Sequence, residues 1–172
     1  MKVWIQRPKS TEKSMKKLRR IQILLVYSSV AQEEKDFKLS FPIMICILLY
    51  INYLYRSLKC IRDGDIEAAR LEAAFSIPSL LDVNFAIHKG RLRPYYKYLK
   101  WELKSFPLTK FPMTGQEIVS NLMKILINAD YKVQQKFLII SEQILRQEGF
   151  DHVFDSWGDD FLWMKNFIPE NE

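Results

Sequence analysis

Residues 40–75 decide the fold and read SFPIMICILLYINYLYRSLKCIRDGDIEAARLEAAF. Pro42 suits the first position of a helix, and a long, mostly apolar run follows it to Asp63. Gly64 can end that helix in a left-handed conformation, and the Asp65 side chain can cap the helix that comes next. The stretch therefore predicts two consecutive long helices joined by a tight turn.

Helical signals of the same kind continue along the rest of the chain. Turn formers are scarce, with 5 Gly and 7 Pro in 172 residues, and apolar residues recur at helical spacing. Both features favour an all-helical protein over a sheet protein. We predict an all-α, up-and-down helical bundle of five to six helices with a short C-terminal helix. The expected helices cover about residues 10–34, 42–63, 65–88, 94–105, 115–128 and 131–147, with the short one near 159–166.

Prolines are expected to modify the middle of the chain. Pro78 lies inside the third predicted helix, where it removes a backbone donor and should kink the helix near Ala74. Pro107 and Pro112 disfavour helix at the residues before them. Residues 106–112 are therefore predicted to form a rigid extended connector.

The net charge of +6 is unevenly distributed. Residues 1–20 carry +7 and residues 89–104 carry +5, whereas residues 105–172 carry −4. Residues 1–9 are expected to be a basic flexible arm, and residues 10–172 to form a single helical bundle domain. Two basic patches on a nearly neutral body indicate an anionic partner, such as phosphate, a nucleotide or an acidic domain. Solvated lysines that aid solubility are the alternative.

Both cysteines fall on one predicted helix. Cys46 and Cys60 are about 21 Å apart at about 1.5 Å per residue, which is too far for a disulfide. Buried free thiols favour a reducing compartment, so we expect a cytoplasmic protein.

The same helix raises the question of a membrane span. The window between Lys38 and Arg56 holds 17 residues without a charge, at the short limit for a span. The buried central helix of a bundle has the same composition, and we expect no membrane span. Residues 39–62 are apolar enough to lie at the centre of the bundle or at the interface of a homodimer.

A basic turn and the helix after it form the main candidate site. Arg91 and Arg93 follow Gly90 and can bind phosphate oxygens with paired donors. Pro94 then opens a helix whose free N–H groups favour anions. The candidate substrate-binding or anion-binding residues are Arg91, Arg93, Tyr96, Lys97, Lys100 and Trp101.

Structural roles are the alternative for these residues. The two guanidinium groups could instead pair with carboxylates and fix the helix corner. The candidate carboxylates are those of Asp82, Glu72 and Asp63. The side chains expected to pack inward are Tyr95, Tyr98 and Leu99. Trp101 either stacks on a base or covers the edge of the core.

Several kinds of catalytic site are missing from the sequence. His88 and His152 lie far apart, with no Cys or carboxylate at ligand spacing, so we expect no metal site. There is no P-loop and no dinucleotide-binding GxGxxG sequence. Arg146 and His152 are separated by five residues, which loosely resembles the Arg…His signature of the helical HEPN ribonucleases. A HEPN-like ribonuclease, toxin or partner protein is therefore an alternative function.

Residues 53–108, about a third of the chain, resemble the C-terminal helical region of bacterial nucleotidyltransferase-domain proteins. The matching elements are YRSLK at 55–59, AARLEAA at 68–74, SIP at 76–78, GRLRPY at 90–95 and KYL at 97–99. Similar proteins pair a small catalytic domain of the DNA polymerase beta type with a helical bundle like that of aminoglycoside (kanamycin-type) nucleotidyltransferases.

The resemblance implies an accessory, substrate-binding domain that is inactive alone. The family's catalytic signature is a Gly-Ser turn followed by an Asp-x-Asp pair on a strand, which binds two magnesium ions. No Gly-Ser occurs in this chain, and Asp63-Gly64-Asp65 falls in a turn between helices. We expect the chain to orient nucleotide or acceptor, or to dock a nucleotidyltransferase catalytic domain that supplies Mg and nucleotide binding. The chain is then a fragment, a truncated product or a stand-alone partner; a purely structural helical protein is the remaining alternative.

Overall fold

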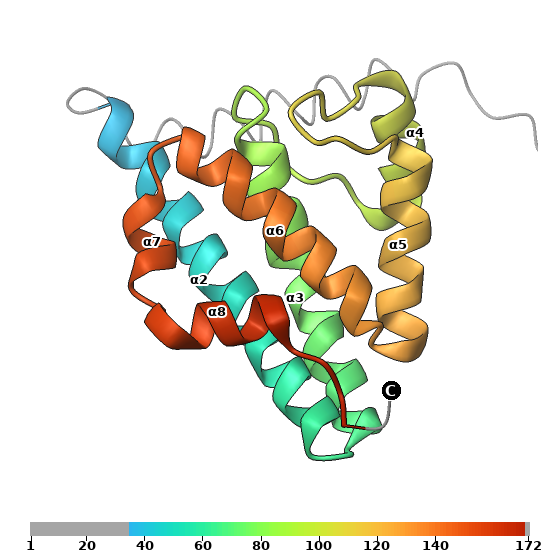
Figure 1. Ribbon diagram of the computed structural model, residues 1–172. Helices are drawn as coiled ribbons and strands as arrows, with labels where there is room; N and C mark the ends of the chain where they lie inside the picture. The colour runs from blue at the N-terminus through green and yellow to red at the C-terminus, as the bar shows by residue number, and fades with distance from the viewer. Residues whose placement is uncertain (1–34, 171–172) are drawn as a thin grey trace, which may run out of the picture. The chain divides into compact units, whose positions relative to one another are not determined.

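The computed structural model describes residues 35–170, which form seven helices and no strand. The predicted all-α class is therefore confirmed. The helices are α2 (Lys35–Arg62), α3 (Ile66–Ala86), α4 (Tyr96–Ser105), α5 (Gly115–Asn128), α6 (Tyr131–Gln147), α7 (Asp151–Asp155) and α8 (Gly158–Asn166) (Figure 1). The chain divides into two units, Met1–Lys38 and Leu39–Glu172, and the bundle is the second. The predicted basic arm and the helix expected at 10–34 lie outside the described residues.

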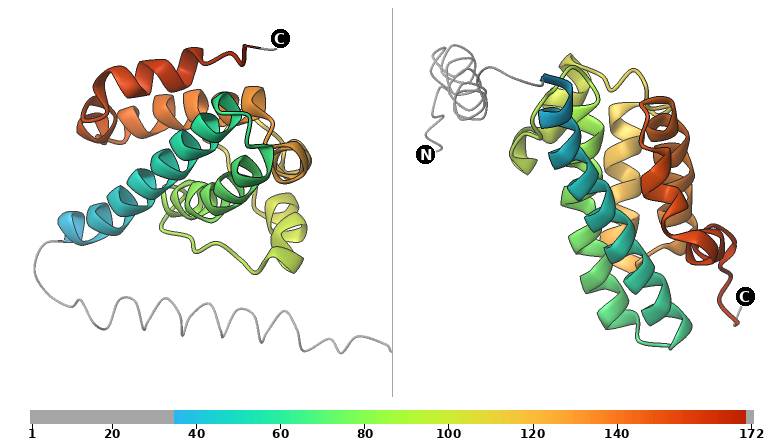
Figure 2. Two further views of the ribbon diagram at one scale, coloured as in Figure 1. Left: turned by 90° about the horizontal axis from the view of Figure 1, so that it is seen from below. Right: turned by 90° about the vertical axis from the view of Figure 1, so that its left-hand side faces the viewer.

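The predicted turn between α2 and α3 is confirmed in detail. Gly64 has a left-handed φ of 79°, and the Asp65 carboxylate accepts a hydrogen bond from the backbone N–H of Ala68. The two helices run alongside each other from this turn (Figure 2). The Ser57 hydroxyl of α2 donates to the carbonyl of Ala69 in α3 over 3.0 Å. Small residues at this contact allow the helices to approach closely.

Both internal prolines lie within continuous helices. The prediction that Pro42 begins a helix is wrong, because α2 begins at Lys35 and Pro42 lies inside it. A proline removes one backbone hydrogen bond, but the turns after it pack into the core and maintain the helix. Ile43 and Ile47 of those turns are buried. α3 likewise continues through Pro78 to Ala86.

One helix in the described part of the chain, Pro42–Arg62, is long and apolar enough to cross a membrane by length and composition. Four of its apolar side chains are fully buried in the bundle. They are Ile47, Ile51, Leu54 and Leu58. The burial is partial, since 39% of the apolar window lies inside the bundle and Ile45, Leu48 and Leu49 are exposed.

In the second half of the bundle, the helices begin and end close to the residues that the sequence predicted. Thr114 and Glu117 form the predicted capping box at the start of α5. α6 covers the predicted residues, and Gly149 after it has a φ of 88°. α5 packs against α3 and α6, while α7 and α8 pack against α6 (Figure 1). α7 was not predicted, because five residues are too few to show a helical period.

The C-terminal helix folds back onto the bundle, as predicted. The Tyr55 ring of α2 makes edge contacts with Trp157 and Trp163, with ring centroids 5.7 and 5.6 Å apart. The Gln135 side-chain amide of α6 donates to the backbone carbonyls of Met164 and Phe167. Aromatic packing and these two hydrogen bonds fix the acidic end of the chain on the core.

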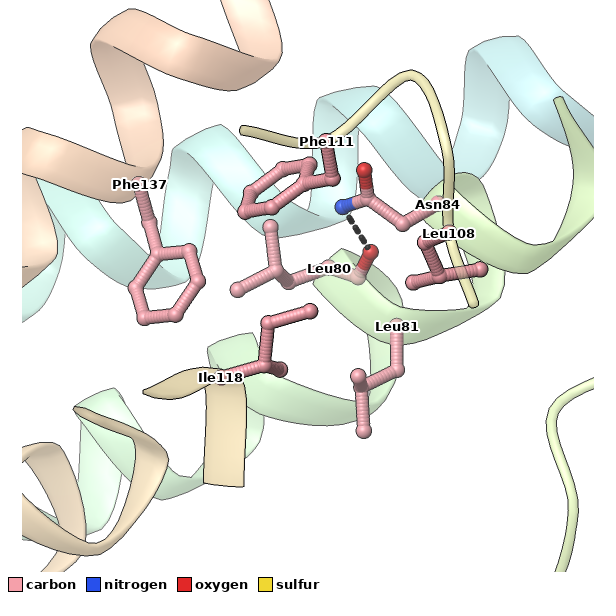
Figure 3. Close-up of a pocket in the computed structure, with 7 residues that line it drawn as sticks. All are labelled: Leu80, Leu81, Asn84, Leu108, Phe111, Ile118 and Phe137. Atoms are coloured by element: carbon pink, nitrogen blue, oxygen red, sulfur yellow. Dashed lines mark hydrogen bonds between the residues drawn. The ribbon is translucent and has the colours of Figure 1, made fainter. Parts of the chain in front are cut away.

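The connector between α4 and α5 has no helix, as its prolines predicted. The prediction that it is extended is wrong, because the backbone N–H of Phe111 donates to the carbonyl of Leu108 and closes a turn. Leu108 and Phe111 of the connector are buried. With side chains of α3, α5 and α6 they line a cavity of about 10 Å³, into which the buried Asn84 also projects (Figure 3). This volume matches a single water molecule and is too small for a nucleotide or an acceptor substrate.

His88 attaches the connector to the end of α3. Its Nδ1 lies 2.5 Å from the carbonyl oxygen of Asn84, and its Nε2 accepts a hydrogen bond from the backbone N–H of Lys110 over 2.9 Å. The tautomer with the proton on Nδ1 satisfies both contacts. Burial lowers the pKa of His88, and the hydrogen bond to Asn84 opposes this only in part.

Candidate functional site

We call residues 89–104, the basic turn and the helix that follows it, the basic corner. It begins after the end of α3 with two consecutive residues that have left-handed backbones. Lys89 and Gly90 both have a φ of 64°, so the chain reverses sharply after His88. The backbone N–H of Gly90 donates to the carbonyl of Ala86, which closes the last turn of the helix. This reversal directs residues 91–95 toward α4.

Arg91 forms a largely buried ion pair. Its guanidinium donates to the Glu102 carboxylate over 2.9 Å, and the side chain of Glu102 is only 2% exposed. The guanidinium also lies 5.0 Å from the centre of the Phe85 ring and 5.8 Å from that of Phe106. Contacts on a carboxylate and two aromatic rings fix the Arg91 side chain in one place.

Arg93 forms a second, more exposed pair with Asp82 of α3. Its Nε donates to the Asp82 carboxylate over 2.8 Å, and its guanidinium lies 5.1 Å from the centre of the Tyr96 ring. Burial alone would lower the pKa of Arg93, but the hydrogen bond and charge of Asp82 outweigh it and raise the pKa. Of the candidate carboxylates, Asp82 is therefore the partner of Arg93.

The other two candidate carboxylates pair elsewhere. Glu72 pairs with Arg56, and Asp63 pairs with Arg62. The true partner of Arg91, Glu102, was missed in the sequence. A signal for it exists, since Glu102 lies at helical spacing with the buried Leu99 and must find a cation there.

α4 begins two residues later than predicted. Its first residue is Tyr96 and not Pro94, and the backbone of Tyr95 before it is extended with a ψ of 140°. Tyr95 is 79% exposed, so the prediction that it packs inward is wrong. Leu99 does pack inward, and Tyr98 is partly buried. The extended backbone directs Tyr95 away from the core before the helical period begins.

The outer face of α4 combines cations and aromatic rings. We call it the α4 face; it consists of Tyr96, Lys97, Lys100, Trp101 and Lys104, all exposed. The Lys97 ammonium lies 4.9 Å from the centre of the Tyr98 ring, and the Trp101 ring makes an edge contact with Phe106. Among the described residues, no ion pair includes Lys97, Lys100 or Lys104. Within the part of the chain that the structure describes, the face therefore presents positive charge that no ion pair neutralises.

The six candidate residues thus divide into two groups. Arg91 and Arg93 are held by carboxylates, and both contact an aromatic ring. Tyr96, Lys97, Lys100 and Trp101 are exposed on one helix, with the lysines one turn from the aromatic residues. Such a surface can bind phosphate oxygens through ammonium groups and stack a planar group on its rings.

Arg146 and His152, the two residues of the HEPN-like alternative, lie on different helices. Arg146 belongs to α6 and pairs with three carboxylates, those of Glu142, Asp151 and Asp155, over 3.0, 3.5 and 2.8 Å. Its guanidinium also lies 5.3 Å from the centre of the Phe154 ring. His152 is exposed on α7, a separate helix. The three carboxylates account for the position of Arg146 without any ligand.

Within residues 35–170, no group of three His, Cys, Asp or Glu side chains could bind a metal ion. Cys46 and Cys60 are free thiols. Neither a known protein family, nor a curated protein, nor a solved structure matches the chain.

Proposed function

We propose that the chain is the helical accessory domain of a nucleotidyltransferase, and that its α4 face binds the phosphates of a nucleotide brought by a catalytic domain. The supporting observation is that the cations of the basic corner fall into two groups, paired arginines and exposed lysines. Carboxylates hold Arg91 and Arg93, whereas the exposed lysines of α4 have no carboxylate partner among the described residues. The proposal also rests on the resemblance of the sequence at residues 53–108 to the helical half of such enzymes.

Each part of the corner has a role in the proposal. Arg91 and Arg93 are positioning residues, since their ion pairs with Glu102 and Asp82 fix α4 relative to α3. Lys97 and Lys100 contact phosphate oxygens, because ammonium groups neutralise the charge that a nucleotide carries. Tyr96 and Trp101 offer rings on which a base can stack.

Catalysis lies outside this chain in the proposal. The nucleotide and its magnesium ions are bound jointly with a catalytic domain that supplies the Asp-x-Asp carboxylates. The helical chain contributes orientation, which lowers the entropic part of the barrier for the transfer. We place the complex in the cytoplasm, where free thiols such as those of Cys46 and Cys60 stay reduced.

The test is thermal stability in the presence of ATP or GTP with magnesium, for the chain alone and with a nucleotidyltransferase catalytic domain supplied in trans. A ligand that binds only the folded state raises the melting temperature. We expect this rise for the wild type and its loss in the double variant Lys97→Glu/Lys100→Glu. The matched control is Lys124→Glu/Lys136→Glu, which changes net charge equally on α5 and α6. No rise under either condition, or equal loss in the control, contradicts the proposal.

A further inference from the structure

A second surface of the bundle is apolar and exposed. We call it the α2–α3 patch; it consists of Ile45, Leu48, Leu49 and Tyr53 on α2 and Leu71 and Phe75 on α3. All but the partly buried Tyr53 have exposed fractions between 37 and 66%. Single exposed apolar residues are ordinary on a protein surface, but a run of six on two neighbouring helices is not.

The patch is continuous across the two helices. Its four α2 residues recur at spacings that place them on one face of the helix, over about 12 Å of its length. The Tyr53 ring stacks on the Phe75 ring with their centroids 5.5 Å apart. Leu71 lies one turn before Phe75 on α3. The two helices therefore offer one connected apolar surface.

An ion pair lies at each end of the patch. Arg56 follows Tyr53 by one turn and pairs with Glu72. At the other end of the patch, Asp82 pairs with Arg93. This end lies close to α2, because the pKa of the Cys46 thiol is raised first by its burial and then by the negative charge of Asp82. Both ends therefore combine positive and negative charge, and neither presents a net charge to an approaching surface.

We propose that the α2–α3 patch binds the same patch of a second copy of this chain, about a twofold axis. In such an interface each surface meets itself, so an apolar centre with neutralised ends is self-complementary. Side chains spaced three and four residues apart on α2 can interdigitate with those of the partner helix. The proposal does not depend on the function of α4.

A bilayer surface is a poorer fit for this patch. Helices that lie on membranes carry unpaired basic residues beside their apolar face. Here the adjacent cations, Arg56 and Arg93, are already paired with carboxylates. Insertion of α2 as a span would also remove Ile51 and Leu54 from the core.

The dimer is expected to be weak and reversible. The patch is small beside the roughly 800 Å² per partner of a standard stable interface. We therefore expect a Kd for the dimer on the order of 10⁻⁵ to 10⁻⁴ M. Association should then be visible at about tens to hundreds of micromolar protein. Reductant is included so that the partly buried Cys46 near the patch cannot form a disulfide between copies.

The test is sedimentation equilibrium of the full chain over that concentration range. We expect a monomer–dimer equilibrium in the wild type and at least about tenfold weaker association in Leu48→Glu/Leu71→Glu. The matched control is Ile127→Glu/Leu162→Glu, which places the same charges at exposed apolar positions on α5 and α8 and should dimerise like the wild type. Far-ultraviolet circular dichroism checks that each variant keeps its helices.

Three results would overturn the proposal. The first is a wild type that stays monomeric at every concentration. The second is a dimer that persists in the patch variant or is equally lost in the control. The third is co-sedimentation of the monomer with neutral phosphatidylcholine vesicles that the patch variant loses, which would assign the patch to a lipid surface.

Discussion

The Arg91 guanidinium donates to the Glu102 carboxylate over 2.9 Å, in a corner where the Glu102 side chain is 2% exposed. Arg91 comes directly after the left-handed turn at the end of α3, and Glu102 lies eleven residues later inside α4. The pair therefore joins the segment that follows α3 to α4. The main role of the Arg91 cation is therefore to stabilise the fold.

Loss of Arg91 should destabilise the protein. Arg91→Ala removes the guanidinium that faces a buried carboxylate, and the cost of breaking such a pair is about 3 kcal/mol. The measurement is the free energy of unfolding from urea denaturation. Arg93→Ala is the matched comparison and should cost about 1 kcal/mol or less, because its pair with Asp82 is more exposed. Equal costs for the two variants would contradict the buried role of Arg91.

Gly115 should not tolerate a side chain. A Cβ atom there would lie 2.5 Å from the Cβ of Leu103, at the contact between α4 and α5. Gly115→Ala is therefore expected to destabilise the protein by about 2 kcal/mol through overpacking. Gly64→Ala meets no neighbouring atom and should cost about 1 kcal/mol, from its positive φ alone. Thermal unfolding compares the two, and a Gly115 variant as stable as the wild type would show that α4 moves away freely.

Stability should fall in mild acid because of His88. The pKa of His88 lies below its ordinary value of 6.5 in the folded protein, so the unfolded chain binds more protons in that interval. The free energy of unfolding therefore decreases as the pH falls from about 6.5 toward the lowered native pKa. Above that interval His88 contributes no pH dependence. The measurement is denaturant unfolding between pH 5 and about 8.

Two variants separate His88 from the other groups that titrate there. His88→Gln removes the titrating ring and should flatten this part of the pH profile, at a lower overall stability. His152→Gln is the matched variant at the other histidine, which is exposed on α7. A profile that responds to the His152 variant and not to the His88 variant would be the reverse of the expectation.

No ribonuclease activity is expected from Arg146 and His152. Three carboxylates surround Arg146, so Arg146→Ala should reduce stability, whereas His152→Ala on the exposed side of α7 should not. The measurement is cleavage of a labelled RNA by the wild type and both variants. Cleavage by the wild type that disappears in both variants would establish the HEPN-like alternative.

Local sequence signals predicted most helix ends because those ends depend on neighbouring residues. The capping box at Thr114 and the glycines at 64 and 149 act within one turn of the chain. The start assigned to Pro42 failed because packing of later turns on the core maintains the helix through it.

The candidate site was only partly predictable, because its pairings depend on tertiary contacts. The sequence analysis named Asp82 as a possible partner of the arginines and omitted Glu102. The spacing of Glu102 from Leu99 indicates that its carboxylate is buried, but only the tertiary structure shows that Arg91 is the cation beside it. The contact between His88 and the backbone of Lys110 spans 22 residues and has no local signal. The exposed lysines of α4 were identified correctly as a group on one helix.

The most direct test of the central claim is a titration of the full chain with ATP and magnesium, in the presence of a nucleotidyltransferase catalytic domain supplied in trans, followed by amide and indole nuclear magnetic resonance of the helical chain. Binding at the α4 face should shift the backbone amides of Lys97 and Lys100 and the indole N–H of Trp101. The same signals should stay unshifted in Lys97→Glu/Lys100→Glu. Shifts confined to other helices, or none at millimolar nucleotide, would contradict the account.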